Sequence, residues 1–424
     1  MEFNTISMIG LGYIGLPTAA VIASRRKNVI GVDINQHAVD TINRGDIHIV
    51  EPELDIIVHS AVKEGYLRAT TTPEPADAFL IAVPTPFKAE NGNDHVPDLT
   101  YIESASKAIA PVLEKGNLVI LESTSPVGAT EQMAKWLAEA RPDLTFPQTQ
   151  GEESDIRIAH CPERVLPGHV VRELVENDRV IGGMTPRCSE VAASLYRFFV
   201  DGECITTTAR TAEMAKLTEN SFRDVNIAFA NELSIICDKI DISVWELIRL
   251  ANRHPRVNIL QPGPGVGGHC IAVDPWFIVS ETPEEARLIR TAREVNDGKP
   301  EWVLEKVQQE VGKFLTAHPD KTARDVTIAC FGLAFKPDID DLRESPALKI
   351  VERLASIHPG NLAIVEPNIE VLPEKLRSNA ELRSASTAIA QADILLLLVD
   401  HREFKKLSIR DTGPRLIVDT RGIW

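Results

Sequence analysis

Short hydrophobic runs alternate with longer segments whose apolar residues recur every three or four positions, and this alternation starts at the beginning of the chain. Four runs, at 6–9, 29–32, 79–83 and 118–121, predict buried strands. Continuous apolar runs are typical of strands that are covered on both faces, and the segments between them have helical spacing. The first part of the chain is therefore expected to be a β-α-β domain with a parallel sheet.

The pattern changes near Cys204, where residues 211–240 contain few helix breakers and predict one long helix. After Pro300 a helical stretch leads to further strands at 326–331, 362–365, 394–399 and 416–418. At 424 residues the chain exceeds what one hydrophobic core usually organises. We expect an α/β protein with an N-terminal Rossmann-type domain over 1–203, a central long-helix domain over 204–305 and a C-terminal α/β domain over 306–424.

A glycine-rich turn follows the first predicted strand. Gly10, Gly12 and Gly15 enclose Tyr13 and Ile14 and lead into a helix, which is the context of a dinucleotide-binding motif. Asp33 ends the next strand, roughly 20 residues downstream, where an acid binds the ribose hydroxyls of NAD. A chance glycine turn with a surface aspartate is the alternative. The order of strand, turn, helix, strand and acid favours NAD.

Hydroxyl groups follow two later strands of the same predicted sheet. Thr85 follows the third strand, and Ser123 and Thr124 follow the fourth. Ligands of parallel sheets bind at the carboxyl ends of the strands, so Thr85, Thr124 and the nearby Thr130 are candidate cofactor contacts. An equally good interpretation is that these residues only cap turns and helices.

Composition and charge limit the function classes. A formal net charge of −16 disfavours a general nucleic-acid binder or a ligand of anionic membranes. The longest apolar run, 394–399, is too short to cross a bilayer, and the first residues lack the basic start of a signal peptide. We expect a cytoplasmic protein. Six scattered cysteines without a C-x-x-C pair predict neither a disulfide framework nor a zinc site.

Polar residues on the predicted long helix recur at intervals of three or four. Glu213, Lys216, Asn220 and Arg223 therefore lie along one face. A solvated charged stripe is the usual explanation of such spacing. Amide and ammonium donors aimed at one point can also stabilise an oxyanion, which makes this face a candidate pocket wall.

A glycine-rich segment, Gly-Val-Gly-Gly-His-Cys-Ile-Ala-Val-Asp-Pro, presents Cys270 among few side chains. A thiolate there would be a nucleophile, favoured by a cation such as Lys216, and Asp274 lies four residues on. Taken alone, Cys270 is more often an inert buried thiol, and His269 is either a metal ligand or a packed histidine.

Two further polar groups are candidates. Glu163 follows a strand that begins near residue 156 and is a candidate general base, with a surface salt bridge to Arg164 as the alternative. His254 and Arg256 either bind an anion or mark a helix end.

These motifs, in this order, resemble the UDP-glucose/GDP-mannose dehydrogenase family over essentially the whole chain. The segments around Cys270 and Arg256 are similar to those of members that oxidise UDP-N-acetyl-D-mannosamine for bacterial surface polysaccharides of the enterobacterial common antigen type. Members that act on UDP-N-acetylglucosamine commonly have proline where this chain has Ala272. UDP-N-acetylglucosamine and UDP-glucose are therefore the alternative substrates.

The resemblance implies an N-terminal NAD domain, a central domain that forms a homodimer and a C-terminal domain that holds the UDP-sugar. It implies a four-electron oxidation without a metal, in which Lys216 and Cys270 are central, Asn220 assists, and Glu163 and Asp274 manage water. Thr124 is included with both the catalytic and the cofactor-binding residues. The implied substrate contacts, besides Lys216 and Asn220, are Arg164, Val165, Arg223, His254, Arg256, Gly267, Phe335, Lys336, Arg343 and Arg421.

Two rival functions remain. A two-electron β-hydroxyacid dehydrogenase also joins an NAD domain to a helix with lysine and asparagine at this spacing, but it has no use for Cys270. A silent nucleotide-sugar sensor would bind in the same pocket without turnover. Counting the hydrides transferred per sugar separates the three hypotheses.

Overall fold

The structure is a computed structural model, and it describes residues 3–49, 51–88, 95–165, 168–268, 270–409 and 415–424. The chain forms two compact units, Met1–Glu219 and Asn220–Trp424. The boundary between them falls inside one helix, α9 (Ala209–Lys239).

Among the described residues of the first unit, eight strands form one sheet in the order β3-β2-β1-β4-β5-β6-β7-β8. Neighbouring strands are parallel except β6 and β7, which are antiparallel. The strands are β1 (Thr5–Ile9), β2 (Asn28–Val32), β3 (Leu67–Thr70), β4 (Ala78–Ile81), β5 (Leu118–Leu121), β6 (Arg157–His160), β7 (Arg179–Gly183) and β8 (Cys204–Thr208).

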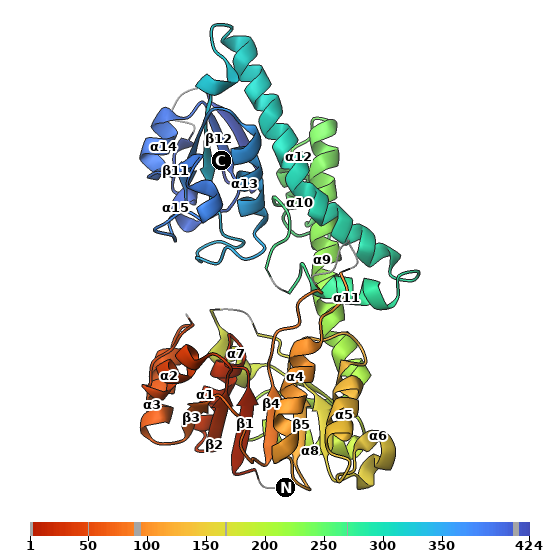
Figure 1. Cartoon of the computed structure of the whole chain (residues 1–424). Helices are drawn as coiled ribbons and strands as arrows, with labels where there is room; N and C mark the ends of the chain where they lie inside the picture. Colours follow the sequence, from red (N-terminus) through yellow and green to blue (C-terminus); the bar gives the residue numbers. More distant parts are fainter. Residues whose placement is uncertain (1–2, 50, 89–94, 166–167, 269, 410–414) are drawn as a thin grey trace. The chain divides into compact units, whose positions relative to one another are not determined.

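Helices cover both faces of this sheet, as Figure 1 shows. Two hydrophobic clusters, one on each face, bury nearly every side chain of the central strands. Burial on both faces explains why these strands are continuous apolar runs in the sequence. The helices are α1 (Gly15–Ser24), α2 (Gln36–Asn43), α3 (Leu54–Lys63), α4 (Thr100–Ile109), α5 (Ala129–Ala140), α6 (Pro147–Gln150), α7 (Val170–Glu176) and α8 (Pro186–Tyr196).

The second unit begins with the remainder of α9 and continues through α10 (Val244–Ala251), α11 (Asp274–Glu281) and the 31-residue helix α12 (Arg287–Ala317). A parallel sheet follows, and its described strands have the order β11-β10-β9-β12-β13. These strands are β9 (Thr327–Phe331), β10 (Asn361–Val365), β11 (Ala380–Leu382), β12 (Ile394–Leu397) and β13 (Leu416–Asp419). The sheet packs with α13 (Pro346–Ile357), α14 (Ala385–Gln391) and α15 (Arg402–Lys405).

The expected fold class is confirmed: a Rossmann-like parallel sheet, a long central helix and a second α/β sheet occur in the predicted order. The strands expected at 6–9, 29–32 and 118–121 correspond to β1, β2 and β5, respectively. The strands β3, β7, β8 and β11 were not predicted, because each has polar residues or glycines among its apolar ones. None of the described helices is long and apolar enough to cross a membrane.

Candidate active site

The glycine turn after β1 has the backbone geometry that a dinucleotide requires. Gly10 has φ +91°, a left-handed conformation that favours glycine. A Cβ on Gly15 would lie 1.8 Å from the carbonyl oxygen of Gly10, so only glycine lets α1 pack this closely. A Cβ on Gly12 would meet no atom within 4 Å, which leaves open space beside the turn. These residues fit the pyrophosphate of NAD.

The amino end of α1 and Asp33 complete this fit. No described side chain caps α1 and its first turn contains no acid, so its positive end is available to a phosphate. The Asp33 carboxylate accepts hydrogen bonds from the N–H groups of Leu11 and Asn35, both at 2.9 Å. It is thereby held between the turn and the end of β2, where a ribose would lie. Tyr13 is 47% exposed, and Ile14 is half-buried at the helix start.

The structure brings Thr85 and Thr124 together. The Thr85 hydroxyl donates to the carbonyl oxygen of Thr124 at 2.6 Å, and the hydroxyl of Ser123 donates to the carbonyl of Val83 at 2.7 Å. These bonds tie the ends of β4 and β5 next to the end of β1. Both predicted threonines therefore lie at the edge of the sheet where the glycine turn lies.

Thr130 and Glu213 have a structural partnership that the sequence did not reveal. Glu213 is 1% exposed, and its carboxylate accepts from the N–H of Gly128, the N–H of Thr130 and the Thr130 hydroxyl, at 2.6 to 2.8 Å. A residue of α9 thus caps the start of α5. The cofactor role of Thr130 remains a prediction, with its hydroxyl already engaged.

Glu163 lies in a cluster of buried side chains that follow the ends of β5 and β6. Its carboxylate pairs with Arg179 at 2.7 Å, and both side chains are at least nine-tenths buried. The nearby Glu122 accepts from the Tyr196 hydroxyl at 2.6 Å. Burial and the charge of Glu163 raise the pKa of Glu122 to about 7, against the opposing effects of Tyr196 and Arg179. Arg179 therefore pairs with Glu163 and also acts electrostatically on Glu122.

The salt bridge between Glu163 and Arg164, which was the alternative to a general base, is absent among the described contacts, although the Arg164 N–H donates to the Glu163 carboxylate. Instead, the Arg164 guanidinium pairs with Glu219 of α9 at 2.7 Å. This pair fixes Arg164, and the half-buried Val165 beside it, next to the first half of α9. If Arg164 binds the substrate, its guanidinium would bind the substrate and Glu219 at the same time.

The central helix places an amide against a carboxylate. The Nδ2 of Asn220 donates to Oδ2 of Asp274 at 2.5 Å, and both residues are buried. Lys216 lies one helical turn before Asn220 and is half-buried. Asp274 is the first residue of α11, where a negative charge is favoured by the helix dipole.

Cys270 is exposed and follows the glycines of a segment that we call the thiol loop, residues 263–273. Its carbonyl oxygen accepts from the N–H groups of Val273 and Asp274, which closes a turn into α11. His269 lies outside the described residues. Substituting Gly267 would place a Cβ 2.9 Å from the Cβ of Phe335, and the ring of Phe335 lies against Gly268. The loop and the turn after β9 are therefore in contact.

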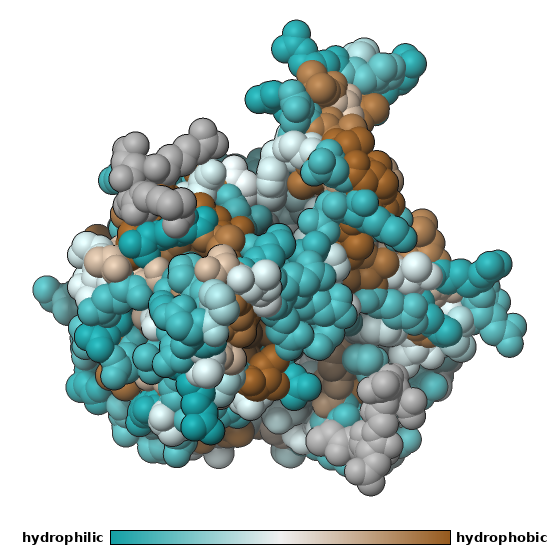
Figure 2. All heavy atoms as spheres, turned by 90° about the horizontal axis from the view of Figure 1, so that it is seen from above, coloured by the Kyte–Doolittle hydropathy of each residue, from teal (hydrophilic) through white to brown (hydrophobic). Residues whose placement is uncertain are grey.

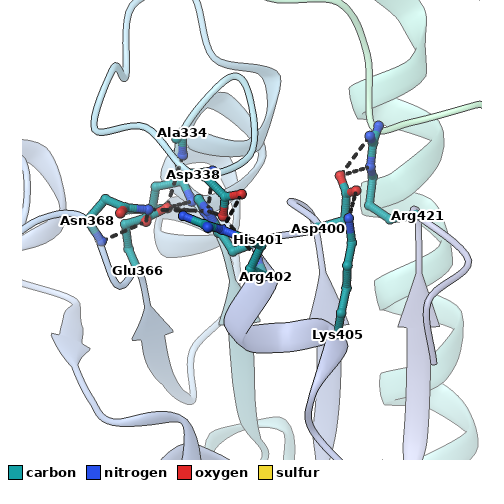
Figure 3. A network of polar contacts seen from close by, with 10 residues as sticks. Ala334, Asp338, Glu366, Asn368, Asp400, His401, Arg402, Lys405 and Arg421 are labelled. Carbon is teal, nitrogen blue, oxygen red and sulfur yellow. Dashed lines mark hydrogen bonds and ion pairs between the residues drawn. The ribbon is translucent and has the colours of Figure 1, made fainter. Parts of the chain in front are cut away.

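Arg421 reaches the other end of the thiol loop. A Cβ on Gly263 would lie 2.6 Å from a guanidinium nitrogen of Arg421. Figure 3 shows Arg421 paired with Asp400, which also binds Lys405, at distances of 2.8 and 2.9 Å. Burial acts to raise the pKa of Asp400, but these two cations lower it below the usual value. Gly265, Phe335 and Arg421 line one small cavity of about 40 Å³.

The remaining predicted substrate residues lie on exposed or half-buried positions of the second unit. Arg223, His254 and Arg256 are exposed, and the Arg256 N–H donates to Nδ1 of His254 at 3.3 Å. Lys336 is half-buried after Phe335, and Arg343 is exposed and pairs with Asp341 at 2.6 Å. These cations give an anionic ligand several possible partners despite the acidic chain.

A dinucleotide turn, a pair of hydroxyls at the same sheet edge and an exposed thiol beside an amide–carboxylate pair define a nicotinamide-dependent dehydrogenase. Family models of the UDP-glucose/GDP-mannose dehydrogenases match the NAD binding domain at residues 4–200, the central domain at 210–298 and the UDP binding domain at 329–424. The chain belongs to this family and uses NAD.

Several relatives match over the full length. UDP-N-acetyl-D-mannosamine dehydrogenase of Yersinia pestis is 68% identical over 424 residues, which is 100% of both chains. NDP-N-acetyl-D-galactosaminuronic acid dehydrogenase of Ralstonia nicotianae is 66% identical and covers 100% of this chain and 97% of its own. The solved structure of UDP-D-ManNAc dehydrogenase from Pyrococcus horikoshii has a TM-score of 0.86 and 38% identity, with 99% and 96% of the two chains covered.

Proposed function

We propose that this protein oxidises the C6 alcohol of UDP-N-acetyl-D-mannosamine to the carboxylate, with two equivalents of NAD, for bacterial surface polysaccharide synthesis. The observation that carries the proposal is the exposed Cys270 on the thiol loop of a chain with a dinucleotide turn. The full-length similarity to dehydrogenases of that name supports the choice of sugar. The cytoplasm, where NAD is available, is the expected location.

The proposed chemistry places a covalent bond on Cys270. NAD, when bound, accepts one hydride in each of two oxidations. After the first hydride leaves C6 and the hydroxyl proton passes to water, the Cys270 thiolate adds to the aldehyde carbon to give a thiohemiacetal. Loss of the second hydride leaves a thioester, water adds to its carbonyl carbon, and the carbon–sulfur bond breaks to release the acid and the thiolate.

The surrounding side chains have roles that match their chemistry. Lys216 and Asn220 donate hydrogen bonds to the oxygen on C6 as negative charge develops on it. Asp274 holds the Asn220 amide, through the 2.5 Å bond, so that its other N–H can face the substrate. Glu163, which pairs with Arg179, accepts a proton from the attacking water.

A second candidate substrate is the galacto-configured N-acetyl sugar nucleotide. It is favoured by the relative named NDP-N-acetyl-D-galactosaminuronic acid dehydrogenase, whose identity of 66% is nearly that of the mannosamine enzymes. The two sugars differ in configuration at ring carbons, so the pocket contacts decide between them.

The test is to incubate the purified protein with NAD and, in parallel, the UDP-linked N-acetylmannosamine, N-acetylgalactosamine, N-acetylglucosamine and glucose. We expect about two NADH per molecule of N-acetylmannosamine sugar, because thioester chemistry links two oxidations. One NADH per sugar would instead support the two-electron rival, and binding without NADH would support the sensor. Cys270→Ser should lose acid formation, and undiminished turnover would exclude the thiol.

We also propose that the protein forms a homodimer through α9. Phe222, Phe229 and Ile236 recur every seven residues and are 68%, 52% and 45% exposed, so they lie near one another along one helix face. Figure 2 shows brown hydrophobic areas between teal hydrophilic ones on the face that it draws. Sedimentation of Phe229→Glu at increasing concentration tests this: the variant should be monomeric where the unchanged protein is a dimer.

A further inference from the structure

Four buried polar residues connect α9 with α12 in the second unit. Asp224 and Asn231 come from α9, and Arg293 and Asn296 come from α12. None of the four is more than 1% exposed. Polar groups are costly to bury unless they are hydrogen-bonded. The hydrogen-bond partners of these four residues therefore show which parts of the structure they hold together.

The four side chains bind one another in sequence. Arg293 donates to the Asp224 carboxylate at 2.7 Å, and Asn296 donates to the same carboxylate oxygen at 2.8 Å. Asn231 donates to the side-chain oxygen of Asn296 at 2.9 Å. Arg293 also pairs with Asp297, which is half exposed. The result is a continuous network across the two helices.

The network also reaches the thiol loop at both ends. The side-chain oxygen of Asn231 accepts from the N–H of Gly263 at 2.9 Å, where the loop begins. The Arg293 guanidinium lies 3.5 Å from the carbonyl oxygen of Ile271, the residue after Cys270. Between these points, a Cβ on Gly265 would lie 3.4 Å from the Asn296 carbonyl oxygen, at van der Waals distance. The contacts of Asn231 and Arg293 both use a backbone atom of the loop.

We propose that Asp224, Asn231, Arg293 and Asn296, which we call the loop frame, are positioning residues that hold both ends of the thiol loop and thereby fix Cys270. This inference rests on the proposed function. The two oxidations and the hydrolysis require one sulfur atom to keep its place relative to C6. A glycine-rich loop contributes few side chains to its own packing, so contacts from neighbouring residues, the frame among them, hold it in place.

Two variants test the frame from its two ends. Asn231→Ala removes the acceptor for Gly263, and Arg293→Lys keeps a positive charge opposite Asp224 but loses the fork that also reaches Ile271. For both we expect kcat for acid formation to fall about 10- to 100-fold, with KM for NAD unchanged, because small displacements of a nucleophile have effects of this size. A misplaced thiol should also release aldehyde, measured with a hydrazine trap.

Lys306→Met is the matched control. Lys306 pairs with Asp238, so it also joins α12 to α9, but none of its described contacts involves the thiol loop. This variant should lose thermal stability without a loss of kcat and without release of aldehyde. If it behaves like the two frame variants, or if the frame variants retain kcat and release no aldehyde, the proposal is wrong.

A measurement without substrate separates this proposal from the proposed function. The rate at which iodoacetamide alkylates Cys270, with Cys270→Ser as the blank, reports the position and surroundings of the thiol directly. We expect a changed rate in both frame variants and the original rate in Lys306→Met. If the unchanged protein forms no NADH with any sugar nucleotide, the proposed function fails, whereas equal alkylation rates in all variants would reject the loop frame.

Discussion

The N-terminal and C-terminal sheets are arranged alike around their first strands, β3-β2-β1-β4-β5 in one and β11-β10-β9-β12-β13 in the other. In each, the first strand ends in a glycine with positive φ, +91° at Gly10 and +96° at Gly332. The second strand ends in an acid, Asp33 or Glu366. Only the N-terminal turn has open space for a dinucleotide. The residues of the two turns must therefore account for the difference in ligand binding between the two sheets.

The acid at the end of β10 closes its turn. Glu366 accepts from the N–H groups of Leu333 and Ala334 at 2.7 and 3.2 Å, and His401 binds the same oxygen at 3.1 Å, as Figure 3 shows. Leu333 and Ala334 stand where the N-terminal turn has Leu11 and Gly12, and both are buried. The acid after the second strand can therefore bind a ligand where the adjacent turn is made of glycines. It stabilises the fold where the turn residues carry side chains.

The largest expected effect comes from filling the open turn. Gly12→Val should raise KM for NAD by more than about 1000-fold, ~4 kcal/mol, because the new side chain occupies the space for the pyrophosphate. The thermal midpoint should be unchanged, since no atom lies within 4 Å of the added Cβ. Gly312→Val, at another open glycine, is the control with unaltered KM. Equal NAD affinity in both variants would contradict the assigned turn.

The next effect concerns the closed turn. Glu366→Gln should destabilise the C-terminal sheet by about 3 kcal/mol, because an amide N–H would face donors that now bind a carboxylate. Burial acts to raise the pKa of Glu366, but His401 and the backbone donors lower it below its ordinary value. Its stabilisation is thus present above about pH 4.5 and lost as the pH falls through the lowered pKa. Hydrogen exchange in β12 against pH measures this, and an unchanged acid profile in Glu366→Gln would refute it.

A smaller effect of opposite sign is expected in the N-terminal sheet. The pKa of Glu122 is about 7 in the folded chain, against 4.5 as the ordinary value. The folded state therefore holds the extra proton between these values, and stability falls as the pH rises from about 4.5 to about 7. Glu122→Gln should remove this dependence and stabilise the first unit by about 2 kcal/mol at pH 8. Exchange of amides in β5 at pH 5.5 and 8 checks the sign.

The smallest effect is on cofactor choice. Asp33→Asn should weaken NAD about 10-fold, ~1.4 kcal/mol, through loss of the charged acceptor for the ribose, and should narrow the preference over NADP. Stability should change little, because an amide oxygen can still accept from Leu11 or Asn35. The KM values for the two cofactors decide the outcome, and a preserved preference would remove Asp33 from the ribose site.

Local patterns predicted most of the fold. Uniformly apolar strands and the 31-residue α9 produce strong periodic signals, which explains why both sheets and the long helix were expected. The reversal between β6 and β7 was not predictable, because strand direction depends on pairing and not on composition. The boundaries of the three expected domains remain predictions.

The candidate site was less accessible to prediction, because its contacts join distant positions. The sequence suggested Glu163 with Arg164, whereas Glu163 pairs with Arg179 and Arg164 pairs with Glu219. Nothing near Arg293 marks it as a partner of the thiol loop. The one local indication is that Arg293 is charged although helical spacing places it on the buried face of α12, where apolar residues are expected.

The boundary between the two compact units falls between Glu219 and Asn220, within the unbroken turns of α9. Lys216 and Asn220 therefore belong to different units yet are separated by a rise of about 6 Å along one helix. The hydrogen-bonded pitch of α9 sets the spacing of these two residues along the helix axis. A proline inserted at this point would change that length without altering either side chain.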